Sequence, residues 1–212
     1  MMTNYEYQWQ SSNPVHSHSF YAPVLLSLFP NATNQNGDRL KVLDLGCGNG
    51  SLTNIIAQQG FDVTGIEESA SGVAQASQAF PDCQFLQHSL YSTPPTELVN
   101  YFDVVVSSDV IEHLCYPREL ARFAKQCLKP NGQLIVTTPY HGYWKNLALA
   151  LLNAMDKHHT VLWDGGHIKF FSVKTLSQLL QEEGFTDLKF KFAGRLPYLW
   201  KGMLVSARSP FA

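Results

Sequence analysis

The stretch Val42–Gly50 reads VLDLGCGNG, and a segment with apolar residues at helical spacing, Ser51–Gln59, follows it directly. A short apolar run that enters three glycines and then a helical pattern indicates a β-strand, a tight turn and an α-helix. Glycine permits positive φ angles and lets a ligand approach the backbone closely, while the first turn of a helix offers free N–H groups. Taken alone, this turn is compatible with several nucleotide-like ligands.

Strand-like and helix-like segments alternate along the chain around this turn. The strand-like segments are Leu40–Asp44, Asp62–Ile66, Cys83–Gln87, Phe102–Ser107 and Gln133–Thr137, and the helical ones between them are Ser51–Gln59, Ala70–Ala79 and Pro117–Leu128. Such alternation predicts parallel strands joined by right-handed crossovers. Phe185–Phe192 and Leu199–Ala207 are expected to close the sheet as an antiparallel pair. We therefore predict an α/β fold with a Rossmann-like, doubly wound sheet of seven strands, mostly parallel with an antiparallel C-terminal strand.

The remaining segments predict one domain over residues 1–212 with two additions. Residues 1–38 precede the first strand and contain a predicted helix, Phe20–Phe29. Residues 138–170 separate the fifth strand from a helix at Ser172–Glu183 and carry a helical pattern near Tyr143–Met155. A long insertion at the carboxyl end of a strand commonly carries substrate-binding residues. We therefore expect residues 138–170 to lie on the substrate side. Asn131-Gly132 is separately predicted to form the turn between the helix Pro117–Leu128 and the fifth strand.

The composition excludes several classes of protein. Hydrophobic residues make up 45% of the chain and charged residues 15%, which excludes intrinsic disorder. The formal net charge of −2 argues against nucleic acid or an anionic membrane as partner. The four cysteines show no metal-binding spacing and indicate reduced thiols. With no signal-peptide pattern and no apolar stretch longer than the six residues Leu147–Leu152, a cytoplasmic protein without a transmembrane segment is expected.

Two acidic residues narrow the choice of ligand for the glycine turn. The spacing is GxGxG, and Ser51 occupies the third glycine position of the dinucleotide pattern GxGxxG. Asp44 at the mouth of the turn would repel a pyrophosphate but suits a ligand that carries an ammonium group and a sulfonium. Glu67 ends the second strand, 17 residues after Gly50, where a carboxylate commonly accepts both ribose hydroxyls.

With these residues the sequence resembles the class I S-adenosylmethionine-dependent methyltransferases. The matching motifs are VLDLGCGNG, VTGIEES, FLQHSL, FDVVVSSDVIEHL and LKPNGQLIVTTP, which together span Leu40 to Pro139. The resemblance implies S-adenosylmethionine as cofactor, with its methionine end at the glycine turn, its ribose at Glu67 and its adenine beside Ser89 and Leu90. The implied cofactor-binding residues are Asp44, Gly46, Cys47, Gly48, Gly50, Glu67, Ser89, Leu90, Ser108 and Asp109. Ser89 stands where the family commonly has Asp.

The motif Asp109-x-x-Glu112-His113 could bind a divalent cation such as Mg²⁺. It is similar to the E-x-x-E-H sequence of the ubiquinone-biosynthesis O-methyltransferases and of the small-RNA 3′-terminal 2′-O-methyltransferases. His167, 54 residues after His113, stands where the RNA enzymes have a further histidine. The competing interpretation is that Glu112 and His113 only cap and pack the following helix.

Three side chains are candidates for removing a proton from the acceptor: His141, Tyr140 and His113. The first two follow the fifth strand, where side chains commonly face the reacting group, and an imidazole with an ordinary pKa near 6.5 suits a general base. The N-terminal residues Tyr5, Trp9, His16, His18, Phe20 and Tyr21 are aromatic and polar together. The resemblance implies that residues 1–38 form a lid over the cofactor; alternatively, their apolar residues only pack a helix on the sheet.

These observations predict S-adenosylmethionine-dependent methyl transfer to a small molecule, to oxygen of an aromatic or quinone-like acceptor. Three alternatives stay open: an RNA-end 2′-O-methyltransferase, a nicotinamide-dependent oxidoreductase, and a cofactor-binding protein without catalysis. The expected partner is the small-molecule acceptor, and the expected assembly is a monomer or homodimer.

Overall fold

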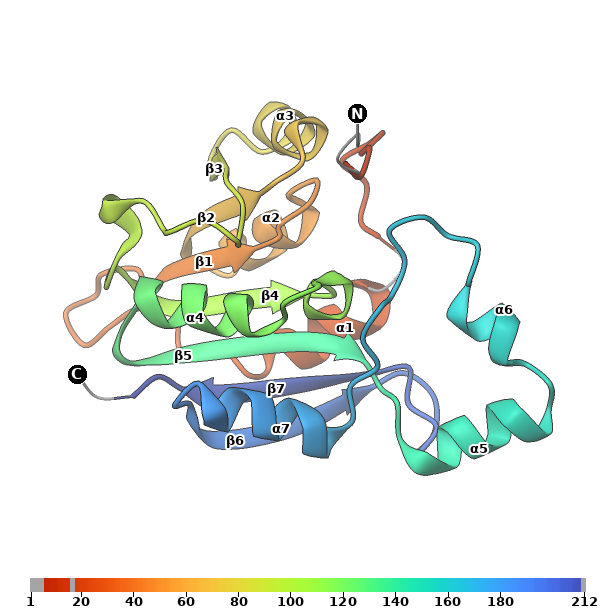
Figure 1. Ribbon diagram of the computed structural model, residues 1–212. Helices are drawn as coiled ribbons and strands as arrows, with labels where there is room; N and C mark the ends of the chain where they lie inside the picture. The colour runs from red at the N-terminus through yellow and green to blue at the C-terminus, as the bar shows by residue number, and fades with distance from the viewer. Residues whose placement is uncertain (1–5, 16–17, 211–212) are drawn as a thin grey trace.

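The computed structural model describes residues 6–15 and 18–210 and has a seven-stranded sheet at its centre (Figure 1). The strands are β1 (Lys41–Leu45), β2 (Asp62–Glu67), β3 (Gln84–Gln87), β4 (Phe102–Ser108), β5 (Leu128–Pro139), β6 (Thr186–Ala193) and β7 (Gly202–Arg208). Their order is β3-β2-β1-β4-β5-β7-β6, and β7 is antiparallel to both of its neighbours. The predicted fold class is therefore confirmed.

Helices cover both faces of the sheet because each central strand is apolar on both sides. The helices are α1 (His18–Leu26), α2 (Ser51–Ala57), α3 (Ala70–Ala79), α4 (Arg118–Cys127), α5 (Tyr143–Leu151), α6 (Met155–His159) and α7 (Val173–Glu182), with 3-10 turns η1 (Thr96–Leu98) and η2 (Ile111–His113). Val42 of β1 belongs to the apolar cluster of α1 and α2. Its neighbour Leu43 belongs to the opposite cluster, which contains α4 and α7.

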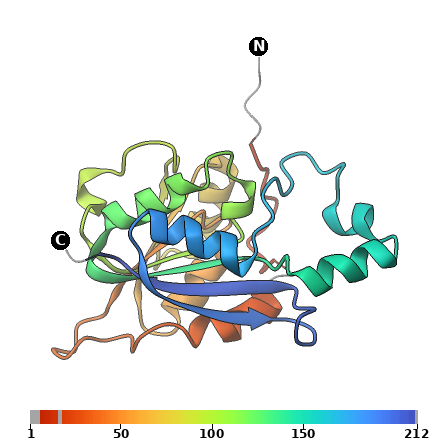
Figure 2. The same ribbon diagram turned by 60° about the horizontal axis from the view of Figure 1, so that its bottom comes forward.

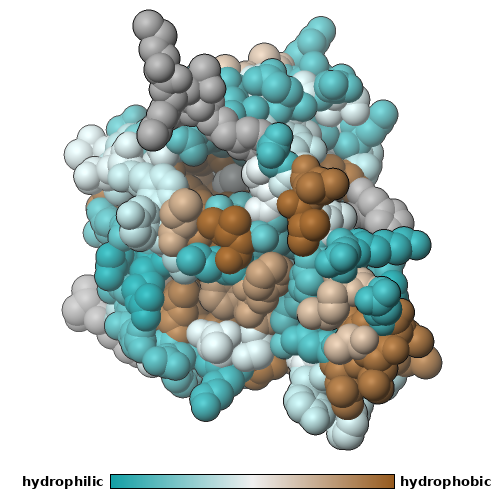
Figure 3. Space-filling model, turned by 45° about the vertical axis from the view of Figure 1, so that its right-hand side comes forward, coloured by the Kyte–Doolittle hydropathy of each residue, from teal (hydrophilic) through white to brown (hydrophobic). Residues whose placement is uncertain are grey.

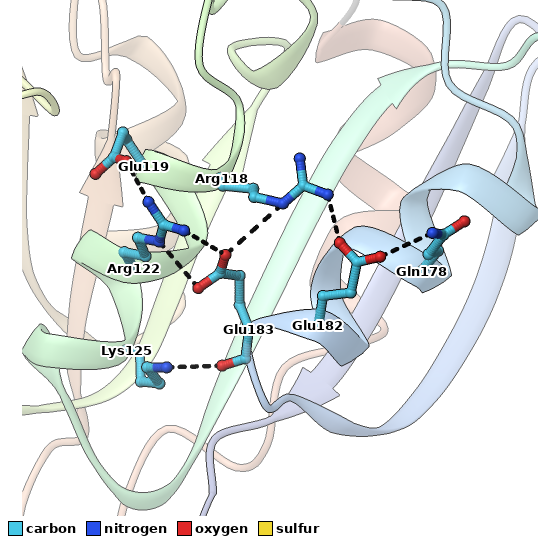
Figure 4. Close-up of polar contacts among 7 residues, drawn as sticks. All are labelled: Arg118, Glu119, Arg122, Lys125, Gln178, Glu182 and Glu183. Atoms are coloured by element: carbon cyan, nitrogen blue, oxygen red, sulfur yellow. Dashed lines mark hydrogen bonds and ion pairs between the residues drawn. The ribbon is translucent and has the colours of Figure 1, made fainter.

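A polar network fixes α7 against α4 (Figure 4). The carboxylate of Glu183, only 10% exposed, lies 3.0 Å from Nη2 of Arg122. Nζ of Lys125 donates to the Glu183 carbonyl oxygen at 2.7 Å, and Arg118 pairs with Glu182. Charged side chains of α4 therefore pair with charged groups at the C-terminal end of α7.

Two segments differ from the sequence predictions. The turn predicted at Asn131-Gly132 is a bulge inside β5, because Leu128 already pairs with Phe102 and Asn131 adopts a left-handed φ of 58°. The single helical pattern predicted near Tyr143–Met155 is broken into α5 and α6. Asn153 adopts a φ of 49° there, and asparagine tolerates this region better than most residues.

The insertion that carries α5 and α6 projects from the body of the molecule (Figures 1 and 2). Several of its apolar side chains are exposed, including Leu152 at 75% and Leu162 at 94%. Figure 3 shows apolar side chains gathered on the face that carries the insertion. Within residues 6–15 and 18–210, no helix combines the length and the apolar character needed to cross a bilayer.

Helix α1 packs against the C-terminal strand β7. The Tyr21 side chain is buried against Gly202, where an added Cβ would lie 1.8 Å from the Tyr21 hydroxyl oxygen. Nε2 of Gln133 on β5 donates to the Leu28 carbonyl oxygen at 2.8 Å. The segment that contains α1 and Leu28 thus depends on β5 and β7 for its position.

Candidate functional site

A cavity of about 910 Å³ opens at the carboxyl ends of β1, β2, β4 and β5. The strand order reverses between β1 and β4, and ligands of open α/β sheets bind at such a switch point. Residues from the N-terminal segment, from α1 and from the insertion cover the cavity, including Trp9, Tyr21 and Trp163. The cavity therefore combines a fixed sheet edge with covers from two separate parts of the chain.

The glycine turn after β1 forms one wall of this cavity. Gly46 and Gly48 have φ angles of 74° and 56°, which favour glycine. An added Cβ would lie 2.5 Å from Val110 Cγ2 at Gly46 and 2.4 Å from Trp9 Cζ2 at Gly48. The backbone N–H groups of Gly46 and Cys47 donate to the Ile66 carbonyl oxygen at 2.8 and 2.9 Å, which holds the turn against β2. Larger side chains here would displace the cover of the cavity.

Two carboxylates flank the turn. Asp44, at 1% exposure, accepts a hydrogen bond from Thr53 Oγ1 at 2.7 Å, and burial raises its pKa to about 7. Glu67 accepts hydrogen bonds from the N–H groups of Gly48 and Ser69, both at 2.9 Å, and burial raises its pKa. No Lys or Arg among the described residues pairs with either acid. The arrangement thus favours a ligand that brings a cation and hydroxyl groups.

Most of the predicted cofactor-binding residues line the cavity, namely Asp44, Gly46, Cys47, Gly48, Glu67, Leu90, Ser108 and Asp109. Gly50 and Ser89 are not among the lining residues. At Gly50 an added Cβ would meet Ala76 and Phe85, so this glycine faces α3 and β3 instead. The Ser89 hydroxyl accepts a hydrogen bond from the Tyr91 N–H at 3.3 Å, within its own loop.

Asp109 lies where β4 ends and has a left-handed φ of 54°. Its Oδ1 accepts a hydrogen bond from Thr137 Oγ1 at 3.3 Å. The buried Tyr21 hydroxyl also hydrogen-bonds to Asp109, and burial, followed by the charges of Asp109 and Glu112, raises the pKa of Tyr21. Asp109 therefore joins the N-terminal helix to the sheet at the cavity.

Three of the four predicted metal ligands come together. Glu112, His113 and His167 place their ligand atoms within 4.8 Å of one another, and Asp109 is not part of this group. Oε1 of Glu112 is buried without a hydrogen-bond partner and lies 4.0 Å from Nε2 of His167, while Oε2 accepts from Thr138 Oγ1 at 3.1 Å. Nδ1 of His113 lies 2.8 Å from the Gly165 carbonyl oxygen, an arrangement that leaves Nε2 free to bind an ion.

The electrostatics of this group are compatible with a divalent cation. Burial, followed by the charge of His113, lowers the pKa of His167 to about 4, so His167 is neutral at ordinary pH. A histidine side chain must be neutral to bind a metal ion. Burial also raises the pKa of Glu112, and Asp109 adds to the shift. A bound cation would compensate the charge of the buried Glu112 carboxylate, whose Oε1 has no hydrogen-bond partner among the described residues.

Tyr140 and His141 do not line the cavity, contrary to their expected position. His141 is 8% exposed, its ring lies 5.1 Å from that of Phe170, and burial, with Lys145 next, lowers its pKa to about 3. This pKa lies well below the ordinary value near 6.5 that suits a general base. The Tyr140 ring packs between Phe192 and Trp200 at 5.5 and 5.4 Å.

Other site residues were missed or lie outside the structure. Thr53, which binds Asp44, and Lys201, which lines the cavity just before β7, stand in no recognisable motif. The predicted lid residues Trp9, His18, Phe20 and Tyr21 line the cavity. Tyr5 and His16 of the predicted lid lie outside the described residues.

The family model described as methyltransferase domain matches residues 16–189 of this chain. The ubiquinone biosynthesis O-methyltransferase of Bradyrhizobium diazoefficiens is 35% identical over 120 residues, which are 54% of this chain and 46% of that protein. The mitochondrial ubiquinone biosynthesis O-methyltransferase of Homo sapiens is 30% identical over 189 residues, 82% of this chain and 50% of that protein. The chain thus spans about half the length of these curated relatives.

Solved structures share the fold at low identity. An S-adenosylmethionine-dependent methyltransferase from Mesorhizobium loti has a TM-score of 0.67 at 22% identity, over 88% of this chain and 96% of that one. A [4+2]-cyclase has a TM-score of 0.69 at 18% identity, over 98% of this chain and 88% of that one. Because a cyclase shares the architecture, the fold alone does not determine the reaction.

Proposed function

Because the chain belongs to the methyltransferase domain family, we propose that it transfers a methyl group from S-adenosylmethionine to an oxygen atom of a small aromatic or quinone-like acceptor. The main support for S-adenosylmethionine as cofactor is the pair of buried carboxylates, Asp44 and Glu67, on either side of the glycine turn. The acceptor class is supported by the names of the relatives, which are ubiquinone biosynthesis O-methyltransferases.

The residues present fit S-adenosylmethionine, which would supply an electrophilic methyl group on a good leaving group. Asp44 and the turn at Gly46–Gly48 would bind its charged methionine end, and Glu67 would accept hydrogen bonds from the ribose hydroxyls. The acids are preorganised, because Thr53 orients Asp44, and the N–H groups of Gly48 and Ser69 orient Glu67. Alignment of acceptor, methyl carbon and sulfur is the main catalytic task of such a site.

His113 is our candidate for removing the acceptor proton, since it lines the cavity and Tyr140 and His141 do not. Alternatively, the same nitrogen of His113 joins Glu112 and His167 in offering two imidazole nitrogens and one carboxylate to a divalent cation; it does not hold the ion and accept the proton at once. Such a donor set suits a first-row transition metal better than Mg²⁺, which prefers oxygen ligands. A cation there would polarise the acceptor hydroxyl and favour its deprotonation. The expected cytoplasmic location and the monomeric or homodimeric state stay predictions.

Calorimetric titration with S-adenosylhomocysteine tests the cofactor assignment. We expect binding by the wild-type protein, a loss of at least tenfold in affinity in Glu67→Ala, and no change in Asp62→Asn, a matched acid at the opposite end of β2. Absence of binding by the wild-type protein, or equal affinities in Glu67→Ala and the wild type, would contradict the assignment.

The acceptor and the cation are tested with S-adenosylmethionine labelled on its methyl group. We expect label in a catechol acceptor, and loss of both bound metal and turnover in Glu112→Gln, with metal content read by mass spectrometry. Label in short RNA and none in the catechol would favour an RNA-end methyltransferase instead, since the Glu112, His113 and His167 group fits that alternative as well. Label in neither acceptor would contradict the proposed reaction.

A further inference from the structure

Asp109, the residue directly after β4, has an uncommon backbone conformation in a position that faces a ligand site. Its φ of 54° lies in the left-handed region. Of the described non-glycine residues with a positive φ, only Asp109 lines the cavity. Such conformations persist where the surrounding structure imposes them, and they gather at binding and active sites. The backbone therefore marks Asp109 as a candidate functional residue.

Two other elements, α1 and β5, hold the Asp109 side chain and backbone in place. The Tyr21 hydroxyl donates to the carboxylate, and Thr137 Oγ1 donates to its Oδ1 at 3.3 Å. The Asp109 N–H donates to the Thr137 carbonyl oxygen at 3.2 Å. Tyr21 is itself fixed, because it is 2% exposed and its hydroxyl packs against Gly202. A binding group that is oriented in this way by its neighbours is preorganised.

Asp109 lies between the glycine turn and the Glu112, His113 and His167 group. The next residue, Val110, contacts the turn, since an added Cβ at Gly46 would be 2.5 Å from Val110 Cγ2. The 3-10 turn η2, which ends at His113, follows directly. Asp109 is only partly buried and lines the cavity. It therefore lies where an acceptor must approach the methionine end of the cofactor.

The chemistry of a carboxylate limits what Asp109 can bind there. A carboxylate accepts about four hydrogen bonds, so the bonds from Tyr21 and Thr137 orient it without using its full capacity. It repels an acceptor oxygen that is losing its proton, because that oxygen becomes negative. Asp109 therefore suits a hydroxyl group that keeps its proton during methyl transfer.

We propose that Asp109 is an acceptor-binding residue, which accepts a hydrogen bond from the hydroxyl next to the one that is methylated, and that Tyr21 is its positioning residue. The inference rests on the proposed function, because it needs the cofactor at the glycine turn. His113 lies one short turn further along the chain and serves the reacting hydroxyl. The acceptor is thus an aromatic ring with two adjacent hydroxyl groups.

Asp109→Asn tests the contact with the acceptor. Asparagine tolerates the left-handed region and keeps one oxygen for Tyr21 and Thr137, while its amide nitrogen cannot accept a hydrogen bond. Catechol and phenol, which lacks the second hydroxyl, are titrated into protein saturated with S-adenosylhomocysteine. We expect the affinity for catechol to fall at least tenfold, as for one hydrogen bond to a charged group, and the affinity for phenol to stay within about twofold. The matched control is Asp187→Asn on β6, an exposed aspartate with a φ of 53° outside the cavity lining, which should bind like the wild type.

Tyr21→Phe tests the positioning role, since phenylalanine keeps the buried ring and lacks only the hydroxyl. We expect kcat/KM for catechol to fall about fivefold, as for one weakened hydrogen bond, with unchanged affinity for S-adenosylhomocysteine. Because Tyr21 acts through Asp109, adding Tyr21→Phe to Asp109→Asn should cause little further loss. Losses that multiply in the double variant would overturn the positioning role and leave Tyr21 a packing residue.

The remaining outcomes separate this inference from the proposed function. Equal losses for catechol and phenol in Asp109→Asn would overturn the contact with a second hydroxyl. A loss of affinity for S-adenosylhomocysteine or of bound metal in this variant would also overturn it, since Asp109 would then serve the cofactor or the cation. If the wild-type protein binds S-adenosylhomocysteine and prefers catechol no more than phenol, only the inference fails. Failure of the wild-type protein to bind S-adenosylhomocysteine would overturn the proposed function itself.

Discussion

Asp44→Asn is expected to stabilise the ligand-free protein at high pH, although it removes a group that we assign to cofactor binding. Burial raises the pKa of Asp44 from 3.8 to about 7. Between these two values the unfolded chain is ionised and the folded protein is protonated, so the unfolded state gains relative stability as the pH rises. The destabilisation begins above the unfolded value, increases up to about pH 7 and is constant beyond it.

The size of the effect follows from the two pKa values. At 1.36 kcal/mol for each pH unit, the ionised carboxylate destabilises the fold by about 1.5 kcal/mol at pH 5 and about 4 kcal/mol at pH 8. The difference between asparagine and aspartate should therefore grow by about 3 kcal/mol from pH 5 to pH 8. In a chain of this length that corresponds to roughly 6–12 °C in Tm. The asparagine carbonyl oxygen can still accept the Thr53 hydrogen bond.

Thermal unfolding of both proteins at pH 5 and pH 8, followed by circular dichroism without ligand, measures this change. A difference in Tm that stays the same at both pH values would refute the buried, unpaired carboxylate as its cause. The same variant should bind S-adenosylhomocysteine weakly at pH 8, where the wild-type carboxylate is ionised and can pair with the ammonium group.

Three further predictions concern the acceptor side, the glycine turn and the packing of the helices. His113→Gln should lower kcat/KM at least tenfold, whereas His141→Gln should remain within about threefold of the wild type; the reverse result in a methyl-transfer assay would return the proton-accepting role to His141. Gly72→Ala should weaken S-adenosylhomocysteine binding in a titration even though alanine favours helices by about 1 kcal/mol, because its Cβ would lie 2.9 Å from the Gly48 carbonyl oxygen; unchanged affinity would contradict this contact. Glu183→Ala should reduce the free energy of unfolding in urea by about 1–2 kcal/mol without altering ligand affinity, and equal stability would show that the network on α4 contributes nothing.

The fold and the cofactor half of the site could be predicted because their signals are local in the chain. Asp44, Gly46 and Gly48 are near neighbours in one turn, and the strand before them determines where they point. Glu67 ends the adjacent strand β2, so parallel pairing brings it to the same edge. Covalent spacing and strand register together determine these positions.

The acceptor half depends on contacts that spacing does not encode. His141 follows β5 as expected, yet α6 and Phe170 pack around its ring and it does not reach the cavity. His167 lies beside Glu112, where the backbone N–H groups of residues 168 and 169 donate to the Glu112 carbonyl oxygen at 2.9 and 3.0 Å. The orientation of these histidines is therefore a tertiary property, while the pairing of Glu112 with His113 was visible in the sequence.

The position of β7 between β5 and β6 has a consequence for how the protein is made. β5 pairs with β7 across a separation of 63 residues, from Pro139 to Gly202. Within the described chain, β7 is the only strand that pairs with β6. During synthesis β6 leaves the ribosome before its partner, so its edge stays open until β7 has emerged. The Tyr21 side chain packs against Gly202, although Tyr21 is synthesised long before Gly202. The acceptor side of the cavity should therefore form after translation of β7, and nascent chains stopped before that point should expose an unpaired strand edge to chaperones.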